Sequence, residues 1–322
     1  MKAIVYTKFG PPEVLHLQEV KKPTPKDNEV LIKIVATTVV KEDPDMRAAP
    51  GFNGFLKPRN PILGQELAGE IEAIGKDVKT FKQGDQVFGL SAINFGTHAQ
   101  YICMPEKGTI TTKPTNMTYE EAAAVCDGLM LAMAYIRKID FKNMPRILIN
   151  GASGSIGCAS VQLAKYYGAK ITAVCDTKNF DLVKSLGAQE VIDYTKDDFT
   201  KDDQMYDVVF DAVGKSSFFR CKKLLKLGGV YFSTELGFLS QNIYLALLTP
   251  IFINRKVMFP IPKASKKDIV IFKELIESEK YKAVIDRRYP LEQIIEATKY
   301  VETGQKTGSV VITVGHNNKE LI

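Results

Sequence analysis

Hydrophobic and polar residues follow two different patterns along the chain. Near the N-terminus, runs rich in β-branched residues at positions 3–6 and 29–35 predict strands, and prolines break the chain between them. Residues 60–104 continue as short apolar runs joined by glycines, which predicts the small strands and turns of a partly open β-barrel. Residues 37–60, between the strand predicted at 29–35 and this region, contain several prolines and glycines, and we expect them to be irregular.

From Tyr119 onward, the pattern changes to strands that alternate with helices. A helical pattern starts at Tyr119 and continues through Tyr135. Later strands are predicted at 147–149, 170–176, 190–193, 207–213, 230–234 and 256–261, and helices are predicted from 156, at 180–186 and at 218–227 with a glycine cap at 228–229. Such alternation predicts a parallel, doubly wound sheet whose ligand crevice lies at the carboxyl ends of the strands.

The C-terminal part returns to mixed structure. Helices are predicted at 266–279 and 291–301, and a closing strand at 309–314. The first of these helices has an apolar face formed by Ile269, Phe272, Leu275 and Ile276. We expect the tail to pair with the N-terminal barrel. Because 322 residues are too many for one comfortable core, two domains are expected.

A glycine-rich turn gives the strongest chemical signal. The apolar run 147–149 leads into a turn on Gly151, Gly154 and Gly157, and an amphipathic segment follows it. The N–H groups at the start of a helix have no partner within the helix, and the helix dipole favours negative charge there. Glycines let the main chain turn sharply and come close to a ligand. A strand, tight turn and helix of this kind therefore suit a pyrophosphate.

Composition excludes several classes of protein. The net charge of +6 comes mostly from dispersed lysines, and no basic run is interleaved with aromatics, so we expect no nucleic-acid partner. Five cysteines without a Cys-x-x-Cys pair and only three histidines argue against a disulfide framework and a cysteine-rich zinc site. The most apolar segment, 243–253, is shorter than the roughly 20 residues that span a bilayer. With no signal-peptide pattern at the N-terminus, we expect a cytoplasmic protein without a membrane partner.

Seven short motifs occur in a fixed order along nearly the whole chain, to about residue 314. They are Gly64-Gln-Glu-Leu-Ala-Gly69, Gly84-Asp-Gln-Val, Asn150-Gly-Ala-Ser-Gly-Ser-Ile-Gly157, Val161-Gln-Leu-Ala-Lys, Ser185-Leu-Gly-Ala, Val191-Ile-Asp-Tyr and Phe210-Asp-Ala-Val-Gly214. Together they resemble the medium-chain dehydrogenase/reductase superfamily, and most closely its zinc-free quinone oxidoreductase branch.

The resemblance implies an α/β fold with two domains. A Rossmann doubly wound parallel sheet, residues 123–259, is inserted in a GroES-like partly open β-barrel domain formed by 1–122 and 260–322. It also implies a nicotinamide cofactor in the cleft, and homodimers through the sixth strand of the Rossmann sheet are common in the family. The apolar segment 238–252 is expected to line the substrate side, to form a dimer interface or to pack in a core.

Residues at the end of the second strand of the nucleotide sheet distinguish NAD from NADP. An acid there binds the ribose 2′-hydroxyl, whereas a cation pairs with a 2′-phosphate. Relatives that use NADPH often have a Lys or Arg here and a Tyr after the third strand, which Lys178 and Tyr194 match. Asp176 stands where serine is usual, and we interpret it as a cap of the following loop or helix that faces solvent. We therefore expect NADPH, with NADH as the alternative.

The cofactor-binding residues that the resemblance implies are Gly151, Ala152, Ser153, Gly154, Ser155, Ile156, Gly157, Thr177, Lys178, Tyr194 and Val213. No metal site is expected, because Val40, Gln65 and Asp127 occupy the positions of the family's catalytic zinc ligands and are poor ligands for zinc. The four-cysteine lobe of structural zinc is also missing.

In zinc-free relatives, hydride passes to a quinone or to the β-carbon of an enone or enal. That reaction needs hydrogen-bond donors near the acceptor oxygen. The candidate catalytic residues are Lys41, which can supply positive charge, Gln65, which can donate through its amide, and Asp127, which can order either. The alternatives are that Lys41 is simply solvated and that Gln65 bonds only the barrel backbone.

Three functional hypotheses follow. The leading one is a zinc-independent, NADPH-dependent oxidoreductase that transfers hydride to a quinone or an α,β-unsaturated carbonyl. The second is a cofactor-binding protein without turnover, because Val40 and Asp45 replace the asparagine and tyrosine of many quinone-reducing relatives. A zinc alcohol dehydrogenase is the third.

Overall fold

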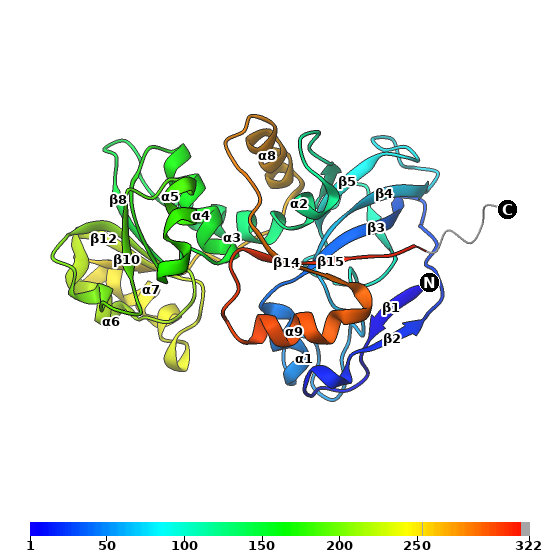
Figure 1. The fold of residues 1–322 in the computed structure, drawn as a ribbon, viewed down its shortest axis with the longest axis horizontal. Helices are drawn as coiled ribbons and strands as arrows, with labels where there is room; N and C mark the ends of the chain where they lie inside the picture. Colours follow the sequence, from blue (N-terminus) through cyan, green and yellow to red (C-terminus); the bar gives the residue numbers. More distant parts are fainter. Residues whose placement is uncertain (253, 317–322) are drawn as a thin grey trace. The chain divides into compact units, whose positions relative to one another are not determined.

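The computed structural model describes residues 1–252 and 254–316, and the chain divides into two compact units (Figure 1). Unit 1 consists of Met1–Asp127 and Ala264–Ile322, and unit 2 of Gly128–Lys263. The domain bounds expected from the sequence, 1–122 with 260–322 and 123–259, stay a prediction, and their last residues, 317–322, lie outside the described residues.

Unit 1 is built on a seven-stranded sheet with the order β14-β15-β3-β4-β5-β7, in which β6 also pairs with β3. A separate hairpin joins β1 and β2. The strands are β1 (Lys2–Val5), β2 (His16–Glu19), β3 (Glu29–Val39), β4 (Glu66–Ile74), β5 (Gln86–Leu90), β6 (Tyr101–Pro105), β7 (Ile110–Thr112), β14 (Ile285–Pro290) and β15 (Ser309–Thr313). The closing strand β15 lies antiparallel to β3, with Val310 opposite Val39. The prediction that the tail pairs with the N-terminal strands is therefore confirmed.

Five helices border or belong to unit 1 in the described part of the chain. They are α1 (Glu42–Ala48), α2 (Tyr119–Ala123), α3 (Cys126–Ile136), which continues into unit 2, α8 (Lys266–Glu277) and α9 (Ile294–Glu302). The apolar face predicted for α8 is confirmed, since Ile269, Phe272, Leu275 and Ile276 are all buried.

Two local predictions for unit 1 were wrong. Residues 37–60 are not wholly irregular, because α1 forms among them. Pro44 lies in the first turn of α1, where its missing N–H breaks no helical hydrogen bond. The single helix predicted from Tyr119 through Tyr135 is two helices, since Ala124 ends α2 and a new helix starts at Cys126.

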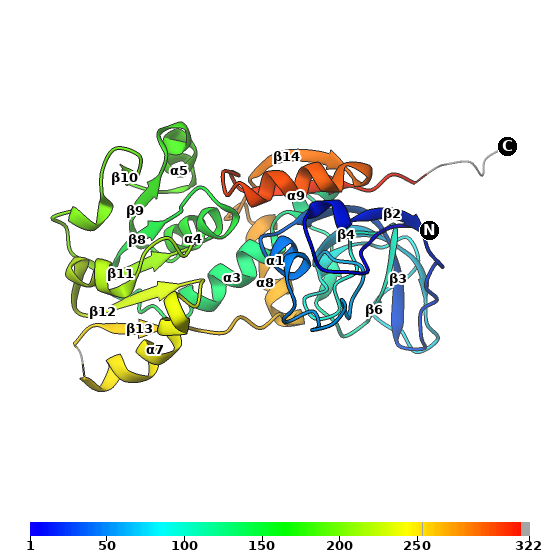
Figure 2. The same ribbon diagram turned by 90° about the horizontal axis from the view of Figure 1, so that it is seen from below.

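Unit 2 contains a six-stranded parallel sheet with the order β10-β9-β8-β11-β12-β13, and Figure 2 shows these strands side by side. The strands are β8 (Arg146–Asn150), β9 (Lys170–Cys175), β10 (Glu190–Asp193), β11 (Tyr206–Asp211), β12 (Leu225–Ser233) and β13 (Lys256–Met258). The helices are α4 (Ser155–Tyr166), α5 (Phe180–Leu186), α6 (Phe218–Cys221) and α7 (Gln241–Phe252). All sheet neighbours run parallel, as the alternation of strands and helices predicted.

The helix predicted at 218–227 is shorter, because α6 ends at Cys221 and a single 3-10 turn, Lys222–Leu224, leads into β12. Gly228 and Gly229 therefore lie inside β12 and do not cap a helix. The pairing of β11 with β12 shifts register at this point, between Tyr206 and Val208. A glycine such as Gly228, with φ of +81°, accommodates such an irregularity.

Most of the apolar segment 238–252 forms α7, and much of it is exposed. Phe238, Leu239, Ile243, Tyr244, Leu247, Leu248 and Ile251 all expose more than a third of their surface. Packing in a core therefore does not account for these side chains. Ile253, the last residue of the apolar segment 243–253, lies outside the described residues. Among the helices of the described residues, none combines the length and the apolar character that a membrane crossing requires.

Candidate functional site

The predicted glycine turn connects β8 to α4 in unit 2. Gly151 adopts φ of +79°, a conformation that favours glycine. The N–H groups of Gly151 and Ala152 both donate to the carbonyl oxygen of Val174 on β9, at 3.0 and 3.1 Å. The N–H of Gly154 donates to the Gly151 oxygen at 3.2 Å and closes the turn. The turn is thus held at the carboxyl end of the parallel sheet.

Each of the three glycines meets a different steric requirement. A β-carbon on Gly157 would lie 2.0 Å from the Gly151 oxygen, and one on Gly151 would lie 2.3 Å from Cγ1 of Val213. A β-carbon on Gly154 would meet nothing closer than 3.6 Å. Gly154 is also the N-cap of α4 and has no side chain that caps the helix. A helix that starts at a glycine turn with this clearance and without a side-chain cap fits a pyrophosphate.

Asp211, at the end of β11, orders the loop beside the turn, and it was not among the site residues expected from the sequence. Its side chain is fully buried. Its Oδ1 accepts hydrogen bonds from the Asn150 amide at 3.0 Å and from the N–H groups of Val213 and Lys215 at 3.4 and 3.3 Å. Its Oδ2 accepts from the Ser216 N–H at 2.8 Å. Asp211 thereby holds Val213 against Gly151. The signal that could have identified Asp211 in the sequence was an acidic residue at the carboxyl end of a strand of the parallel sheet.

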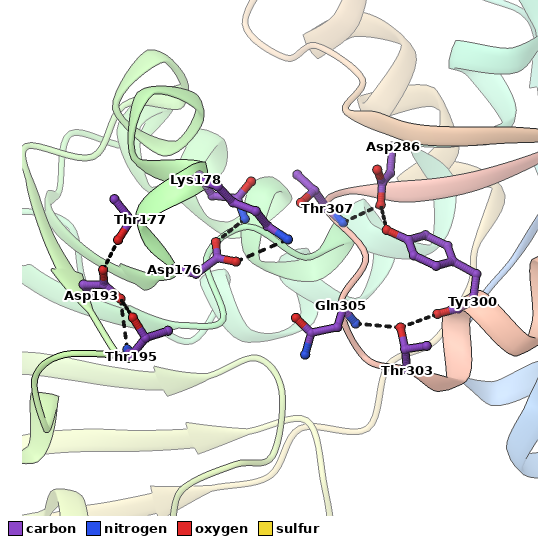
Figure 3. A network of polar contacts seen from close by, with 11 residues as sticks. Asp176, Thr177, Lys178, Asp193, Thr195, Asp286, Tyr300, Thr303, Gln305 and Thr307 are labelled. Carbon is purple, nitrogen blue, oxygen red and sulfur yellow. Dashed lines mark hydrogen bonds and ion pairs between the residues drawn. The ribbon is translucent and has the colours of Figure 1, made fainter.

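The ends of β9 and β10 carry the residues expected to distinguish NADP from NAD (Figure 3). Lys178 exposes 58% of its side chain, and its Nζ lies 3.3 Å from Oδ2 of Asp176. Tyr194 is half exposed, and its N–H donates to the Cys175 oxygen at 3.2 Å. Thr177 donates its hydroxyl to Asp193, which lies on the neighbouring strand. The two strand ends are therefore joined by both main-chain and side-chain bonds.

Asp176 is the N-cap residue of the 3-10 turn Thr177–Asn179, as interpreted from the sequence, but the expectation that its side chain faces solvent was wrong. Its side chain is only 19% exposed and makes no capping bond to the main chain. Instead its carboxylate accepts from the side-chain amide of Asn179 and pairs with Lys178. Opposite charges at this distance attract each other, so the acid and the cation that the sequence left as alternatives are partners here.

The candidate catalytic residues Lys41, Gln65 and Asp127 all belong to unit 1. Lys41 is exposed and directly precedes α1, whereas Gln65 and Asp127 are buried. The main-chain oxygen of Gln65 accepts from the Ser91 N–H at 2.7 Å. Gln65 lies directly before Glu66, whose Oε1 accepts the Asp127 N–H at 2.6 Å. This bond joins the start of β4 to the first turn of α3.

Three buried carboxylates gather around these positions, and two of them, Asp43 and Glu66, were not among the candidate residues expected from the sequence. Asp43 accepts main-chain hydrogen bonds from Val40 and Gly64, both at 3.0 Å. Glu66 also accepts the hydroxyl of Thr38. Their signal was weak, because the partners of Glu66 and the Gly64 donor of Asp43 are distant in sequence, and the single local bond from Val40 to Asp43 forms no distinctive pattern.

Burial keeps these carboxyl groups protonated to unusually high pH. Desolvation raises the pKa of Glu66 to about 7, although the hydrogen bonds from Asp127 and Thr38 oppose this shift. Desolvation and the nearby carboxylates of Glu42 and Glu66 hold the pKa of Asp127 well above its ordinary value. Burial raises the pKa of Asp43 as well. The cluster can therefore retain protons near neutral pH.

A cation near the cluster comes from the loop between α9 and β15, whose bonds Figure 3 also shows. Asp286 accepts the Tyr300 hydroxyl at 2.6 Å and the Thr307 N–H at 2.8 Å. Lys306, next to Thr307, donates its ammonium group to the Gly308 oxygen at 2.7 Å. Its charge lowers the pKa values of Glu66 and Asp127 and so moderates the effect of burial.

No group of three or more His, Cys, Asp or Glu side chains is arranged to hold a metal ion in residues 1–252 and 254–316. Val40 is buried, and Gln65 and Asp127 lie among the hydrogen bonds described above.

The two units have the architecture of a dehydrogenase that combines a dinucleotide-binding parallel sheet with a mostly antiparallel catalytic sheet. Two family profiles match the chain: one described as an alcohol dehydrogenase GroES-like domain covers residues 26–114, and one described as a zinc-binding dehydrogenase covers residues 186–312. The chain belongs to the medium-chain dehydrogenase/reductase superfamily.

Similar proteins extend over almost the whole chain. It is 35% identical to a 2-methylene-furan-3-one reductase of Solanum lycopersicum, in a match that covers 97% of this chain and 79% of that protein. It is 32% identical to a chloroplastic NADPH-dependent alkenal/one oxidoreductase of Arabidopsis thaliana, with the same coverage. The structure of a quinone oxidoreductase from Coxiella burnetii superimposes with a TM-score of 0.87 and 26% identity, and covers 98% of this chain and 99% of that chain. The α/β fold with GroES-like and Rossmann parts is therefore confirmed.

Proposed function

We propose that the protein is a zinc-independent, NADPH-dependent oxidoreductase that reduces α,β-unsaturated carbonyl compounds or quinones. The observation that carries this proposal is the glycine turn at the start of α4, which has space at Gly154 and no side-chain cap, together with Lys178 just after the next strand. The names of similar proteins, which include an alkenal/one reductase and quinone oxidoreductases, support the acceptor class.

The bound cofactor supplies the hydride. The turn 151–157 and the first turn of α4 hold the pyrophosphate with main-chain N–H groups, and Val213 packs against Gly151 to keep the turn in place. Thr177, Lys178 and Tyr194 lie at the ends of β9 and β10, and they bind the ribose that carries the 2′-phosphate. Such a phosphate pairs well with the exposed ammonium group of Lys178.

On the acceptor side, the reaction places negative charge on the carbonyl or quinone oxygen. Gln65 donates to that oxygen through its amide Nε2, and the exposed ammonium group of Lys41 adds positive charge. Burial raises the pKa of Asp127 well above its ordinary value, which disfavours a charge there that would repel the oxyanion, and Asp127 orders these donors. None of these roles needs a metal ligand.

Steady-state oxidation of NADPH with a panel of enones, enals and quinones tests the proposal. We expect turnover with at least one electron-poor acceptor. Tight NADPH binding without turnover of any acceptor would instead favour the cofactor-binding protein without activity. In parallel, titration with NADPH and NADH tests the cofactor assignment: Lys178→Ala is expected to weaken NADPH binding selectively, and Asp176→Ser to strengthen it. Equal loss of both cofactors in the lysine variant would refute the assignment.

A homodimer and a cytoplasmic location belong to this proposal. Strand β13 is the edge of the parallel sheet, and an edge strand has unpaired main-chain groups that can bond a second copy. The exposed apolar side chains of α7, which packs beside β13, offer a surface that association would cover. Light scattering of the purified protein measures the assembly, and imaging of a tagged protein measures the location.

A further inference from the structure

Asp193 ends β10, the edge strand of the parallel sheet, and has an unusually complete set of partners. Its carboxylate is 5% exposed. Oδ1 accepts from both the N–H and the hydroxyl of Thr195, at 2.9 and 2.6 Å, and Oδ2 accepts the hydroxyl of Thr177 from the neighbouring strand end (Figure 3). The hydroxyls of Thr177 and Thr195 hold the pKa of this carboxyl well below its ordinary range, so Asp193 is ionised at neutral pH.

These bonds fix the two segments that carry the expected NADPH contacts. Asp193 lies opposite Cys175 in the pairing of β10 with β9. One bonded threonine, Thr177, directly precedes Lys178, and Tyr194 lies between Asp193 and the other bonded threonine, Thr195. Besides the main-chain bond from Tyr194 to Cys175, the carboxylate of Asp193 therefore links the segment of Lys178 to that of Tyr194.

The same segments contain two lysines and two aspartates in ion pairs. Lys178 lies 3.3 Å from Asp176, and Lys196 lies 3.5 Å from Asp193. Both ammonium groups are largely exposed, with 58% and 66% of the side chains accessible, whereas both carboxylates are mostly covered. The lysines are therefore the solvent-exposed members of each pair, and the two pairs together carry no net charge.

We propose that Asp193 is a positioning residue for the 2′-phosphate of NADPH, and that Lys196 is a second cation of that subsite beside Lys178. The inference rests on the proposed use of NADPH. Through its hydrogen bonds, Asp193 sets the ends of β9 and β10 so that the two lysines approach one phosphate from different strands.

The chemistry of the phosphate explains why two cations are needed. A phosphate monoester carries roughly −1.5 to −2 charges at neutral pH, and one lysine balances only part of that. When the phosphate binds, each lysine turns from its aspartate toward the phosphate oxygens. The charge of Asp193 stays stabilised by the Thr177 and Thr195 hydroxyls, so losing Lys196 does not leave it without partners. NADH lacks this phosphate and draws on neither lysine in this way.

The test is a calorimetric titration of the purified full chain with NADPH and with NADH. Asp193→Ala removes all four interactions, and we expect NADPH affinity to fall about tenfold or more, a size typical of lost hydrogen bonds to a charged group, with NADH affinity within about twofold. Asp193→Asn keeps an acceptor for Thr195 and a partner for Thr177, so NADPH should bind at least as tightly as to the unaltered protein. Lys196→Ala is expected to weaken NADPH binding alone.

Asp198 provides a matched control. Its Oδ1 accepts from the N–H and hydroxyl of Thr200 at 3.0 and 2.7 Å, the same local contact that Asp193 makes with Thr195. Asp198→Ala should leave both cofactors unaffected. If Asp193→Ala does not fold, Thr195→Val, which removes a hydroxyl bond to Asp193 without touching a residue assigned to the cofactor, and Lys196→Ala decide, since each is expected to weaken NADPH binding selectively.

The outcomes separate this inference from the proposed function. If the unaltered protein does not bind NADPH, the proposed cofactor is wrong. If it binds NADPH but the Asp193 and Lys196 variants bind it equally well, or lose NADH to the same extent, the role of Asp193 is wrong while the proposed reductase stands. An Asp193→Asn variant that loses as much affinity as Asp193→Ala also overturns the inference, because the hydrogen bonds would then not be the cause.

Discussion

Replacing Glu66 with glutamine should change how the stability of unit 1 depends on pH. Glu66 is 1% exposed, and burial raises its pKa from an ordinary value of 4.5 to about 7. Glutamine has nearly the same shape, and its amide oxygen can still accept the Asp127 N–H while its amide nitrogen donates to the hydroxyl of Thr38. The variant therefore removes the titration and keeps most of the contacts.

The sign of the effect follows from where the proton is held. Between pH 4.5 and about 7, the folded protein keeps a proton on Glu66 that the unfolded chain releases. The stabilisation is thus fully present below pH 4.5 and is lost as the pH rises through about 7. At ~1.4 kcal/mol per pH unit, the difference amounts to roughly 3 kcal/mol across that window.

Thermal unfolding of the unaltered protein and of Glu66→Gln at pH 5 and pH 8 measures this difference. We expect the variant to gain stability relative to the unaltered protein at pH 8 and to gain little at pH 5. At ~2–4 °C per kcal/mol for a unit of this size, the relative shift should be several degrees. Glu70, exposed on the same strand, gives the control variant Glu70→Gln. Parallel pH profiles for Glu66→Gln and the unaltered protein would refute the reasoning.

Three further predictions concern unit 2. Gly157→Ala should abolish NADPH binding in a calorimetric titration, because its β-carbon would lie 2.0 Å from the Gly151 oxygen. Gly154→Ala, with 3.6 Å of clearance, should keep the melting temperature of the protein and weaken only its affinity for the cofactor. Equal NADPH affinity of the two variants would contradict this. Asp211→Ala should lower the free energy of unfolding by about 2–4 kcal/mol in urea, because it leaves several buried donors without an acceptor, and a change below ~1 kcal/mol would show that water replaces it. Leu247→Glu on the exposed face of α7 should yield monomers in light scattering if the proposed dimer uses this face, and an unchanged mass would show that it does not.

Local patterns in the sequence accounted for much of unit 2. The predicted bounds of α5 and β10 agree with the structure residue for residue, and the glycine turn lies where the strand-turn-helix pattern placed it. These features depend on neighbours within a few positions, such as the stop at Gly187 after α5. At Leu225, pairing with Tyr206 on the neighbouring strand decides the secondary structure instead. There the local pattern wrongly extended the predicted helix into β12.

The candidate site was harder to predict, because its bonds join distant positions. Glu66 bonds Asp127 across 61 residues, and no periodic pattern indicates such a pair. The partial burial of the Asp176 side chain was missed for the same reason, since it depends on how the segment after β9 packs.

The sequence by itself predicted that a glycine turn binds a dinucleotide and that Val40, Gln65 and Asp127 occupy the positions of the family's zinc ligands. Both conclusions depend on the identity of residues at fixed spacing. Only the tertiary structure decided which carboxylates are protonated and which are ionised, because desolvation and hydrogen bonding depend on what surrounds each group. Glu66, buried with few donors, keeps its proton near neutral pH, while Asp193, bonded by Thr177 and Thr195, loses it readily.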